Sequence, residues 1–348
     1  MRPTELGPDL NTIAGWMTQS GIGRGDVEGV TVLAGGTQNL VVRFSLGGRP
    51  FVLRCASPIS DGGNETIRRE AHILAALADT AVPHPRLVAS GDPGLLGYDF
   101  YLMEAIEGFN AVTKMPALHA GRADIRHAMG LSIVDSLAEI GNVDYQACGL
   151  ADLGRPEGFL ARQVPRWLSQ LHSYHGFAGW PGPAQLGAVQ RVADWLETNV
   201  PSDFCPGIMH GDFHIANVMF ANDGPEVAAI IDWELCTIGD PRLDLGWLIA
   251  TWPHEHLPSL EAVRLQPSDG FPKGEVLVAR YAERTTRDMS SFGWFAVLAC
   301  FKLGILLEQT FARSLAGKAS EATGKMLHQD ACKLFDRAAQ WIESGKWN

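Results

Sequence analysis

Residues His210 to Asn217 read HGDFHIAN, and residues Ile231 to Trp233 read IDW. The first segment lies directly after the apolar pair Ile208-Met209 and directly before Val218-Met219-Phe220, which has the composition of a strand. The segment is therefore expected to be a loop that core structure holds at both ends. Polar residues concentrated in a loop of this kind indicate a functional site.

A hairpin is expected to bring Asp232 back to this loop. Val218 to Phe220 and Val227 to Ile231 read as strands, and the Asn-Asp-Gly-Pro sequence between them is typical of a turn. Because a hairpin returns the chain to the place where it began, the oxygen-bearing side chains of Asp212, Asn217 and Asp232 are expected to converge.

These side chains suit the transfer of a phosphoryl group. Mg²⁺ prefers carboxylate and amide oxygens, and it usually takes one or two protein carboxylates together with phosphate oxygens and water. Asn217 and Asp232 fit that description as metal ligands. Asp212 could accept a hydrogen bond from a substrate hydroxyl and orient it for attack. A structural alternative stays open, in which these residues only form turns and cap a strand.

The pattern HGDxxxxN followed by IDW resembles the catalytic loop and metal-binding strand of the aminoglycoside phosphotransferase family, which is related to protein kinases. The resemblance implies an α+β, protein-kinase-like fold with a small N-terminal antiparallel-sheet lobe containing one helix and a larger, mainly helical C-terminal lobe. It also implies ATP and Mg²⁺ as cofactors and a small-molecule hydroxyl as the phosphate acceptor. In this pattern Asp212 is catalytic, and Asn217 and Asp232 hold the metal. His210 supports the geometry of the loop.

The segment from Gly239 to Leu245 reads GDPRLDL. By its local chemistry, Asp240 is expected to cap the N-terminus of a helix whose first residue is Pro241. The same string resembles the GDPxxDL segment of the family, in which the second acidic residue hydrogen-bonds to the catalytic loop. Asp244 is therefore expected to support the site rather than to bind the metal.

Residues 1–105 are predicted to form the nucleotide-binding lobe. Short β-rich runs, separated by glycine-containing turns, flank a single helical pattern. The expected strands are Val30 to Leu33, Leu40 to Phe44, Phe51 to Arg54, Leu87 to Ala89 and Phe100 to Met103, and the expected helix is Glu65 to Ala78.

Residues 106–348 are predicted to form the helical lobe, which would hold the catalytic loop and the acceptor site. The hairpin described above is the one β segment expected in it. The expected helices are Arg122 to Ile140, Glu157 to Tyr174, Ala188 to Thr198, Gly274 to Arg287, Phe292 to Leu315 and Ala319 to Gly345.

The small lobe offers candidate contacts for ATP. The loop from Ala34 to Asn39 joins two expected strands, and its backbone N–H groups could lie over phosphates as glycine-rich loops do in kinases, with a plain hairpin turn as the alternative. The residues at the end of the last strand occupy the place of the inter-lobe hinge, whose backbone would receive the adenine edge. The candidate ATP contacts in these two segments are Gly35, Gly36, Thr37, Asn39, Met103, Glu104 and Ala105.

Arg54 and Glu70 are expected to form an ion pair that contributes to the ATP site. Kinases place a cation on the third strand and a carboxylate on the following helix. Glu70 falls between Leu74 and Leu77 on the apolar stripe of its helix, where a carboxylate needs a cationic partner. Arg54 stands where kinases carry lysine, which keeps the charge and changes the geometry of its contacts. The alternative is a solvated Arg54 with Glu70 at the edge of the stripe.

Composition argues against several other classes of protein. The balance of 28 Lys+Arg against 39 Asp+Glu gives a formal net charge of −11, the wrong sign for binding nucleic acid or an anionic membrane. The 6 cysteines form no CxxC pair, which favours reduced thiols and a cytoplasmic protein. The longest apolar stretch, Trp294 to Leu307, is interrupted by Lys302 and is expected to be too short to span a bilayer.

Two other functions stay open. His210 and His214 have the i, i+4 spacing of a zinc hydrolase motif, although Gly211 disfavours a helix and the middle glutamate of that motif is missing. A catalytically inactive, nucleotide-binding pseudokinase is the second, but its usual mark is the loss of the base or of a metal ligand. The sequence does not fix the acceptor, which could be an aminoglycoside-like compound or a metabolite such as a hydroxyacyl thioester.

Overall fold

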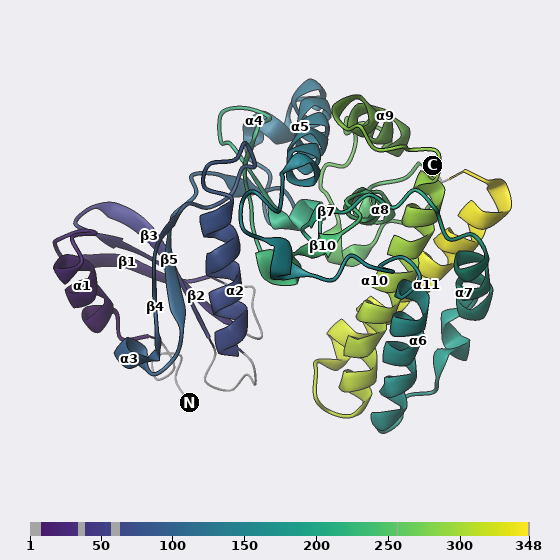
Figure 1. Ribbon diagram of the computed structural model, residues 1–348, viewed down its shortest axis with the longest axis horizontal. Helices are drawn as coiled ribbons and strands as arrows, with labels where there is room; N and C mark the ends of the chain where they lie inside the picture. Colours follow the sequence, from purple (N-terminus) through teal and green to yellow (C-terminus); the bar gives the residue numbers. More distant parts are fainter. Residues whose placement is uncertain (1–7, 34–38, 57–62, 256, 347–348) are drawn as a thin grey trace. The chain divides into compact units, whose positions relative to one another are not determined.

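The computed structural model describes residues 8–33, 39–56, 63–255 and 257–346. The chain forms two compact units (Figure 1). The first contains Met1–Glu107 and Ala228–Glu234, and the second contains Gly108–Val227 and Leu235–Asn348. The predicted helical lobe, 106–348, included residues 228–234. They group with the first unit instead, where the Ile230 N–H donates a hydrogen bond to the Pro83 carbonyl (2.9 Å).

The first unit is built on a five-stranded sheet with strand order β1-β2-β3-β5-β4, and all of its pairs are antiparallel. Its strands are β1 (Val27–Val32), β2 (Asn39–Leu46), β3 (Arg49–Ala56), β4 (Leu87–Gly91) and β5 (Phe100–Glu104). Gly47 and Gly48 join β2 to β3 with φ values of 58° and 79°, a left-handed conformation that glycine adopts without strain. The antiparallel sheet lobe predicted from the sequence is confirmed.

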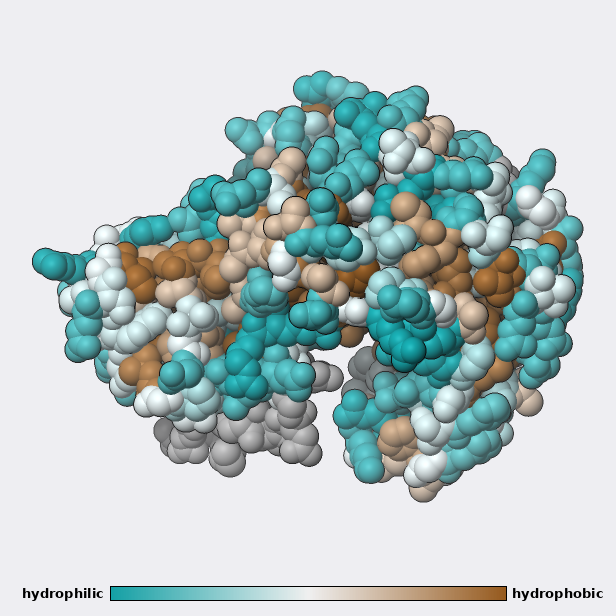
Figure 2. Space-filling model, in the orientation of Figure 1, coloured by the Kyte–Doolittle hydropathy of each residue, from teal (hydrophilic) through white to brown (hydrophobic). Residues whose placement is uncertain are grey.

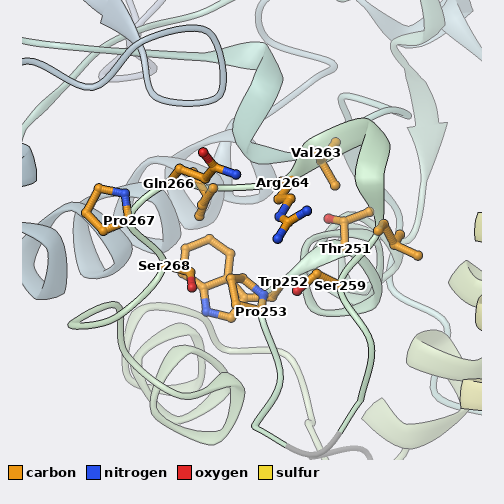
Figure 3. A pocket seen from close by; sticks show the side chains of 11 residues that line it. Thr251, Trp252, Pro253, Ser259, Val263, Arg264, Gln266, Pro267 and Ser268 are labelled. Atoms are coloured by element: carbon orange, nitrogen blue, oxygen red, sulfur yellow. The ribbon is translucent and has the colours of Figure 1, made fainter.

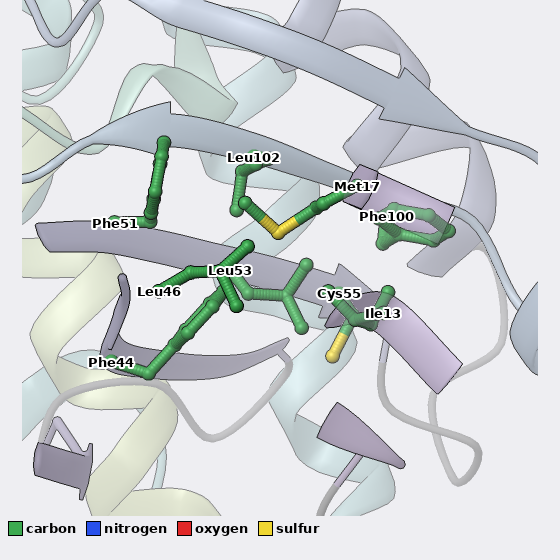
Figure 4. Packing of buried hydrophobic residues seen from close by; sticks show 9 residues of the cluster. All are labelled: Ile13, Met17, Phe44, Leu46, Phe51, Leu53, Cys55, Phe100 and Leu102. Atoms are coloured by element: carbon green, nitrogen blue, oxygen red, sulfur yellow. The ribbon is translucent and has the colours of Figure 1, made fainter. Parts of the chain in front are cut away.

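Side chains of β3 alternate between two helices, because successive residues of a strand point to opposite faces. Phe51, Leu53 and Cys55 face α1 (Leu10–Gln19) in the cluster of Figure 4, which also contains Ile13 and Met17. The opposite face of the sheet carries α2 (Gly63–Ala76), close to the predicted Glu65 to Ala78. The short helix α3 (Pro93–Leu96) follows β4 and precedes β5 along the chain.

Helix α1 was not predicted. Its N-cap is Asp9, whose Oδ1 accepts the backbone N–H groups of Asn11 and Thr12. Trp16 packs edge-on against Phe100, with ring centroids 5.3 Å apart. The Asp9 cap and the apolar spacing of Ile13 and Met17 are the sequence signals that could have identified this helix.

The second unit is mainly helical, as predicted. Its α-helices are α4 (Ala117–Ala120), α5 (Ala123–Asn142), α6 (Gln163–Ser173), α7 (Val189–Thr198), α8 (Arg242–Thr251), α9 (Gly274–Arg284), α10 (Phe292–Leu315) and α11 (Glu321–Ser344). Helix α6 begins later than the predicted Glu157, because residues 157–162 form turns. On the face shown in Figure 2, hydrophilic residues cover most of this unit's surface and hydrophobic residues form smaller patches.

Two small sheets contain strands of this unit. β6 (Phe109–Asn110), β8 (Val218–Phe220) and β9 (Val227–Ile230) form one, and the Ala221 N–H donates to the Glu226 carbonyl at the end of the predicted hairpin. β7 (Gly207–Met209) pairs with β10 (Thr237–Gly239) in the other. The prediction of a single β segment was therefore wrong, since three-residue strands are too short to show a periodicity.

Helix α10 has 24 residues and, by length and composition alone, could cross a membrane. The expectation that this stretch is too short was wrong, because the helix extends beyond Trp294 to Leu307 at both ends. It packs closely against α8 and α11: a Cβ at Gly246 would lie 2.6 Å from the Phe295 carbonyl oxygen, and one at Gly304 would lie 2.7 Å from the Phe335 ring. Its apolar residues form the core of the second unit.

We expect Leu53→Ala to lower the free energy of unfolding by about 2–5 kcal/mol, because Leu53 is fully buried and its truncation leaves a cavity. Urea unfolding followed by circular dichroism measures this. Val30→Ala in the same sheet is the matched control, since Val30 is 52% exposed and should cost less than about 0.5 kcal/mol. Equal losses in the two variants would contradict the assignment of the core.

Candidate active site

The loop from His210 to Asn217 leaves β7 and enters β8 through a short 3₁₀ helix at Ile215–Asn217. Gly211 has a φ of 86°, and a Cβ there would lie 2.3 Å from the Leu235 carbonyl oxygen. Only glycine avoids both the strained backbone and the clash. The loop therefore turns tightly against the segment that leads into β10.

Asp244 holds this turn from the first turn of α8. Its Oδ2 accepts the backbone N–H of His210 (2.6 Å), and its Oδ1 accepts that of Gly211 (3.0 Å). The side chain is almost completely buried, and burial raises its pKa to about 7, an effect that the two N–H groups and the charge of Lys302 oppose. Asp244 lies where the family resemblance placed it, as a support of the loop. His210 is also fully buried, which suits a structural role.

Asp212 is positioned by the residues that follow it. The Asn217 amide nitrogen donates to the Asp212 carbonyl oxygen (2.9 Å) and to its Oδ2 (3.1 Å), and His214 Nε2 lies 3.3 Å from Oδ1. Burial raises the pKa of Asp212, but His214, His210 and Lys302 outweigh it and hold the pKa at about 2. Asp212 is therefore a carboxylate at neutral pH, able to accept a hydrogen bond from a substrate hydroxyl.

Lys302 was not identified as a site residue from the sequence. It extends from α10 and donates from Nζ to the Gly211 carbonyl oxygen (3.2 Å), with the Trp247 and Trp167 rings 4.5 Å and 5.4 Å away. Burial lowers its pKa to about 8, opposed by the carboxylates of Asp244 and Asp212. A lysine inside an apolar helix was the signal that could have revealed it.

Asp240 lies at the start of α8 and its Oδ1 accepts the backbone N–H of Arg242 (3.1 Å), which is the contact expected of a cap, although the helix is assigned from Arg242. The same side chain binds the fully buried guanidinium of Arg242 through Oδ1 (2.9 Å) and Oδ2 (2.7 Å), a second role that was not predicted. A buried arginine needs a carboxylate, and that requirement determines the position of the Asp240 side chain.

In the first unit, Arg54 gathers three carboxylates. Its Nη2 lies 2.9 Å from Glu70 Oε1, 3.1 Å from Asp232 Oδ1 and 3.1 Å from Glu234 Oε2. Burial lowers the pKa of Arg54, but the surrounding acidic groups outweigh burial and hold it above its ordinary value. The expected Arg54–Glu70 pair is present, and Glu234 is a further partner that sequence reasoning missed.

Glu70 is fixed on both of its oxygens. Tyr101 donates its hydroxyl to Oε2 (2.7 Å), and Arg54 approaches Oε1. Only 1% of the Glu70 side chain is exposed, and burial raises its pKa to about 7 against the pull of these two partners. Glu70 is therefore the buried and fixed partner of Nη2, and the same nitrogen also contacts the more exposed carboxylates of Asp232 and Glu234.

Asp232 and Glu234 supply the exposed carboxylates of this group. Asp232 has a φ of 67°, a left-handed backbone that costs free energy for a residue other than glycine and is typical of functional positions. Its side chain is 37% exposed, against 13% for Arg54. One oxygen each from Glu70, Asp232 and Glu234 lie within 4.8 Å of one another. These oxygens are of the kind that a hard cation such as Mg²⁺ prefers. The amide oxygen of Asn217 is of the same kind, and the amide nitrogen of Asn217 donates to Asp212.

The remaining predicted ATP contacts are distributed as follows. Gly35, Gly36 and Thr37 lie outside the described residues. Asn39 begins β2, Met103 and Glu104 end β5, and Ala105 follows. Glu104 forms an ion pair with Arg49 (2.7 Å).

The structure groups the predicted site residues by unit. Arg54, Glu70 and Asp232 are together in the first, and Asp212 and Asn217 are together in the second. The convergence of Asp232 with the loop stays a prediction.

The chain matches the sequence profile of the phosphotransferase enzyme family over residues 29–277. The chain belongs to the phosphotransferase enzyme family. Among solved structures, it resembles a Ralstonia eutropha protein provisionally named an aminoglycoside phosphotransferase, with a TM-score of 0.78 and 26% identity over 96% of this chain and 99% of that one. A thermostable mutant of aminoglycoside phosphotransferase APH(4)-Ia, in a ternary complex with ADP and hygromycin B, has the same fold at 17% identity, with a TM-score of 0.60 over 93% and 98% of the two chains. The protein-kinase-like fold is thereby confirmed.

Curated relatives of this phosphotransferase-family chain are longer proteins. It is 30% identical to acyl-CoA dehydrogenase family member 10 of Mus musculus over 279 residues, which are 79% of this chain and 25% of the relative. It is 30% identical to acyl-CoA dehydrogenase family member 11 of Rattus norvegicus over 304 residues, which are 84% of this chain and 37% of the relative. The chain thus spans 25% and 37% of the length of these two relatives.

The structure does not support the zinc hydrolase alternative. Residues 210–214 are not helical, so His210 and His214 do not share a helix face. A separate cavity of about 260 Å³ lies in the second unit near the end of α8, where Thr251, Ser259 and Arg264 are among its lining residues (Figure 3). None of the predicted site residues is among the residues that line this cavity.

We expect Lys302→Met and Asp244→Asn each to lower the free energy of unfolding by about 1–3 kcal/mol, because each removes one of two electrostatically coupled charges together with its hydrogen bonds to the loop. Their double variant should lose less than the sum, since both remove the same interaction. Urea unfolding measures all three. Lys325→Met is the control: Lys325 lies 2.5 Å from Glu321 in an exposed pair, which is worth about 0–1 kcal/mol. Additive losses would show that the two charges are not coupled.

Proposed function

We propose that this protein is an ATP-dependent phosphotransferase that moves the γ-phosphoryl group of Mg·ATP to a hydroxyl of a small molecule. The observation that carries the proposal is the arrangement of Asp212, an ionised carboxylate fixed by Asn217 and His214 in a loop that Asp244 and Lys302 hold rigid. Such positioning provides most of the catalysis in phosphoryl transfer, since the transition state leaves little covalent chemistry to the protein.

Each residue has a separate task in this proposal. Asp212 accepts a hydrogen bond from the attacking hydroxyl and takes its proton as the oxygen–phosphorus bond forms. Because the pKa of Asp212 is held at about 2, its main effect is to orient the hydroxyl rather than to remove the proton early. Asp232 and Asn217 supply oxygen ligands to Mg²⁺, which when bound neutralises charge on the phosphates. Arg54 contributes positive charge to the nucleotide site while Glu70 holds it.

We propose a hydroxylated acyl thioester as the first acceptor to test. The two curated relatives are named acyl-CoA dehydrogenase family members, and this chain corresponds to only part of their length. The simplest explanation is that the region matching this chain acts on the same class of substrate as the remainder of each relative. Aminoglycosides are the second class, since the APH(4)-Ia structure contains hygromycin B.

Asp212→Ala should lower turnover by about 10²- to 10⁴-fold, because it removes the group that orients and deprotonates the hydroxyl. The measurement is ADP release in a coupled assay with a panel of hydroxyacyl-CoA thioesters and aminoglycosides. Asp223→Ala, at an exposed turn position of the same unit, is the control and should retain full activity. Unchanged turnover in Asp212→Ala would exclude this mechanism, and absence of acceptor-dependent turnover in the unmodified protein across the panel would favour the pseudokinase.

Asp232→Asn should weaken the binding of Mg·AMP-PNP at least about tenfold, because the substitution removes a carboxylate ligand while asparagine tolerates the left-handed backbone at this position. Isothermal titration calorimetry with Mg²⁺ and with EDTA measures the difference. In EDTA the variant and the original protein should bind AMP-PNP alike. Glu28→Ala, exposed in the same unit, is the control. A similar loss with and without Mg²⁺ would argue against a metal role for Asp232.

A further inference from the structure

A line of three polar side chains crosses from α10 to α11 within the second unit. Glu308 of α10 is fully buried, and its Oε1 accepts the indole N–H of Trp180 (2.7 Å). Its Oε2 lies 2.7 Å from Nδ1 of His328 on α11. On the far side of the imidazole, Nε2 lies 3.8 Å from Sγ of Cys332. None of these residues belongs to the phosphotransferase loop.

The ring of His328 is held in one orientation. A carboxylate can only accept a hydrogen bond, so Nδ1 carries the proton toward Glu308. The Phe311 ring stacks on the imidazole with centroids 4.3 Å apart and an interplanar angle of 28°. His328 and Cys332 are one helical turn apart on the same face of α11. Nε2 is therefore directed at the sulfur.

The Cys332 thiol is accessible as well as oriented. It is partly exposed, and its S–H donates to the Gln185 carbonyl oxygen (3.4 Å). Cys55, Cys236 and Cys300 are buried, whereas Cys205 is exposed. Cys205 provides an internal reference for a surface thiol.

The surroundings of Cys332 would make it unreactive if no base assisted it. Burial raises the pKa of the Cys332 thiol, and the charges of Glu308 and Asp336 raise it further. Because the thiolate is the nucleophile, a raised pKa slows reaction unless a neighbouring base takes the proton. A nucleophile beside a base that a third group orients is the arrangement that activates serine and cysteine nucleophiles.

We propose that Cys332 is a nucleophilic thiol activated by His328 and Glu308, and that it is a site of covalent modification by small disulfides that are neutral or cationic. The thiol proton passes to His328 Nε2, the sulfur forms a bond to one sulfur of the disulfide, and the S–S bond of the reagent breaks. The leaving thiolate takes up the proton from the imidazolium. The carboxylates of Glu308 and Asp336 disfavour an anionic reagent. This site is independent of the proposed phosphoryl transfer.

The first test compares alkylation rates within one protein. The full chain is treated with iodoacetamide at pH 7 and each cysteine peptide is quantified by mass spectrometry over time. The sulfur displaces iodide, so the reaction reports nucleophilicity directly. Cys332 should react about tenfold faster than the more exposed Cys205. A rate equal to or below that of Cys205 would overturn the proposal, since burial alone predicts that order.

His328→Gln tests the base. Glutamine can still donate an N–H to Glu308 but has no basic nitrogen to receive the thiol proton. The Cys332 rate should fall to that of Cys205 or below, and the Cys205 rate should not change. Thermal unfolding shows whether the variant is folded, and if it is not, the comparison within the unmodified protein still decides. A Cys332 rate that the variant leaves unchanged would remove His328 from the mechanism.

The second test uses disulfides of different charge. Cystamine is cationic and 5,5′-dithiobis(2-nitrobenzoate) is anionic, and their relative rates at Cys332 and Cys205 are compared. The ratio of the cystamine rate to the 5,5′-dithiobis(2-nitrobenzoate) rate should be about tenfold higher at Cys332 than at Cys205, because the carboxylates near Cys332 attract a cation. Equal preferences at the two cysteines would refute the predicted selectivity. A mixed disulfide at Cys332 that is absent in Cys332→Ser is the expected product.

Discussion

The carboxylate of Asp244 is the constraint on which the rest of the catalytic loop depends. It binds two consecutive backbone N–H groups, at His210 and Gly211, from a position that water hardly reaches. Buried N–H groups without partners would each cost free energy, so the loop cannot leave this carboxylate without a penalty. Lys302 completes the arrangement by donating to the carbonyl oxygen of Gly211. Both the donor and the acceptor of that peptide segment are thus fixed.

Arg54 has the corresponding position in the first unit. Glu70, which accepts the Tyr101 hydroxyl, contacts its Nη2, and Asp232 and Glu234 meet the same atom from more exposed positions. A lysine would bring one compact ammonium to this place, whereas the planar guanidinium brings several N–H donors in a fixed geometry. In this structure one nitrogen of the guanidinium, Nη2, contacts Glu70, Asp232 and Glu234.

Buried carboxylates on apolar helix faces recur in this chain. Glu70 on α2, Asp244 on α8 and Glu308 on α10 are each almost fully buried, and each has a donor on both oxygens or a cation nearby. A carboxylate on such a face costs free energy unless hydrogen bonds or a nearby cation compensate for its lost hydration. Each of them accordingly lies at the centre of a set of oriented side chains, and two of these sets belong to the residues predicted for phosphotransfer.

The sequence by itself determined the long helices, whose apolar residues repeat with the helical period, and the motif from His210 to Asn217. Helical periodicity predicted α5, α7, α9, α10 and α11, and the apolar stripe of α2 identified Glu70 as a buried acid. The pattern from His210 to Asn217 was sufficient to predict the loop, because the contacts among Asp212, His214 and Asn217 are local. The side chains that hold the loop, Asp244 and Lys302, come from other elements. Tertiary structure alone decided the contacts of Lys302 with Gly211, of Glu234 with Arg54 and of Glu308 with His328. Their partners lie in other elements, as with Arg54 and Glu234, which are 180 residues apart. No local pattern encodes such a contact, since only the folded chain brings the charges together.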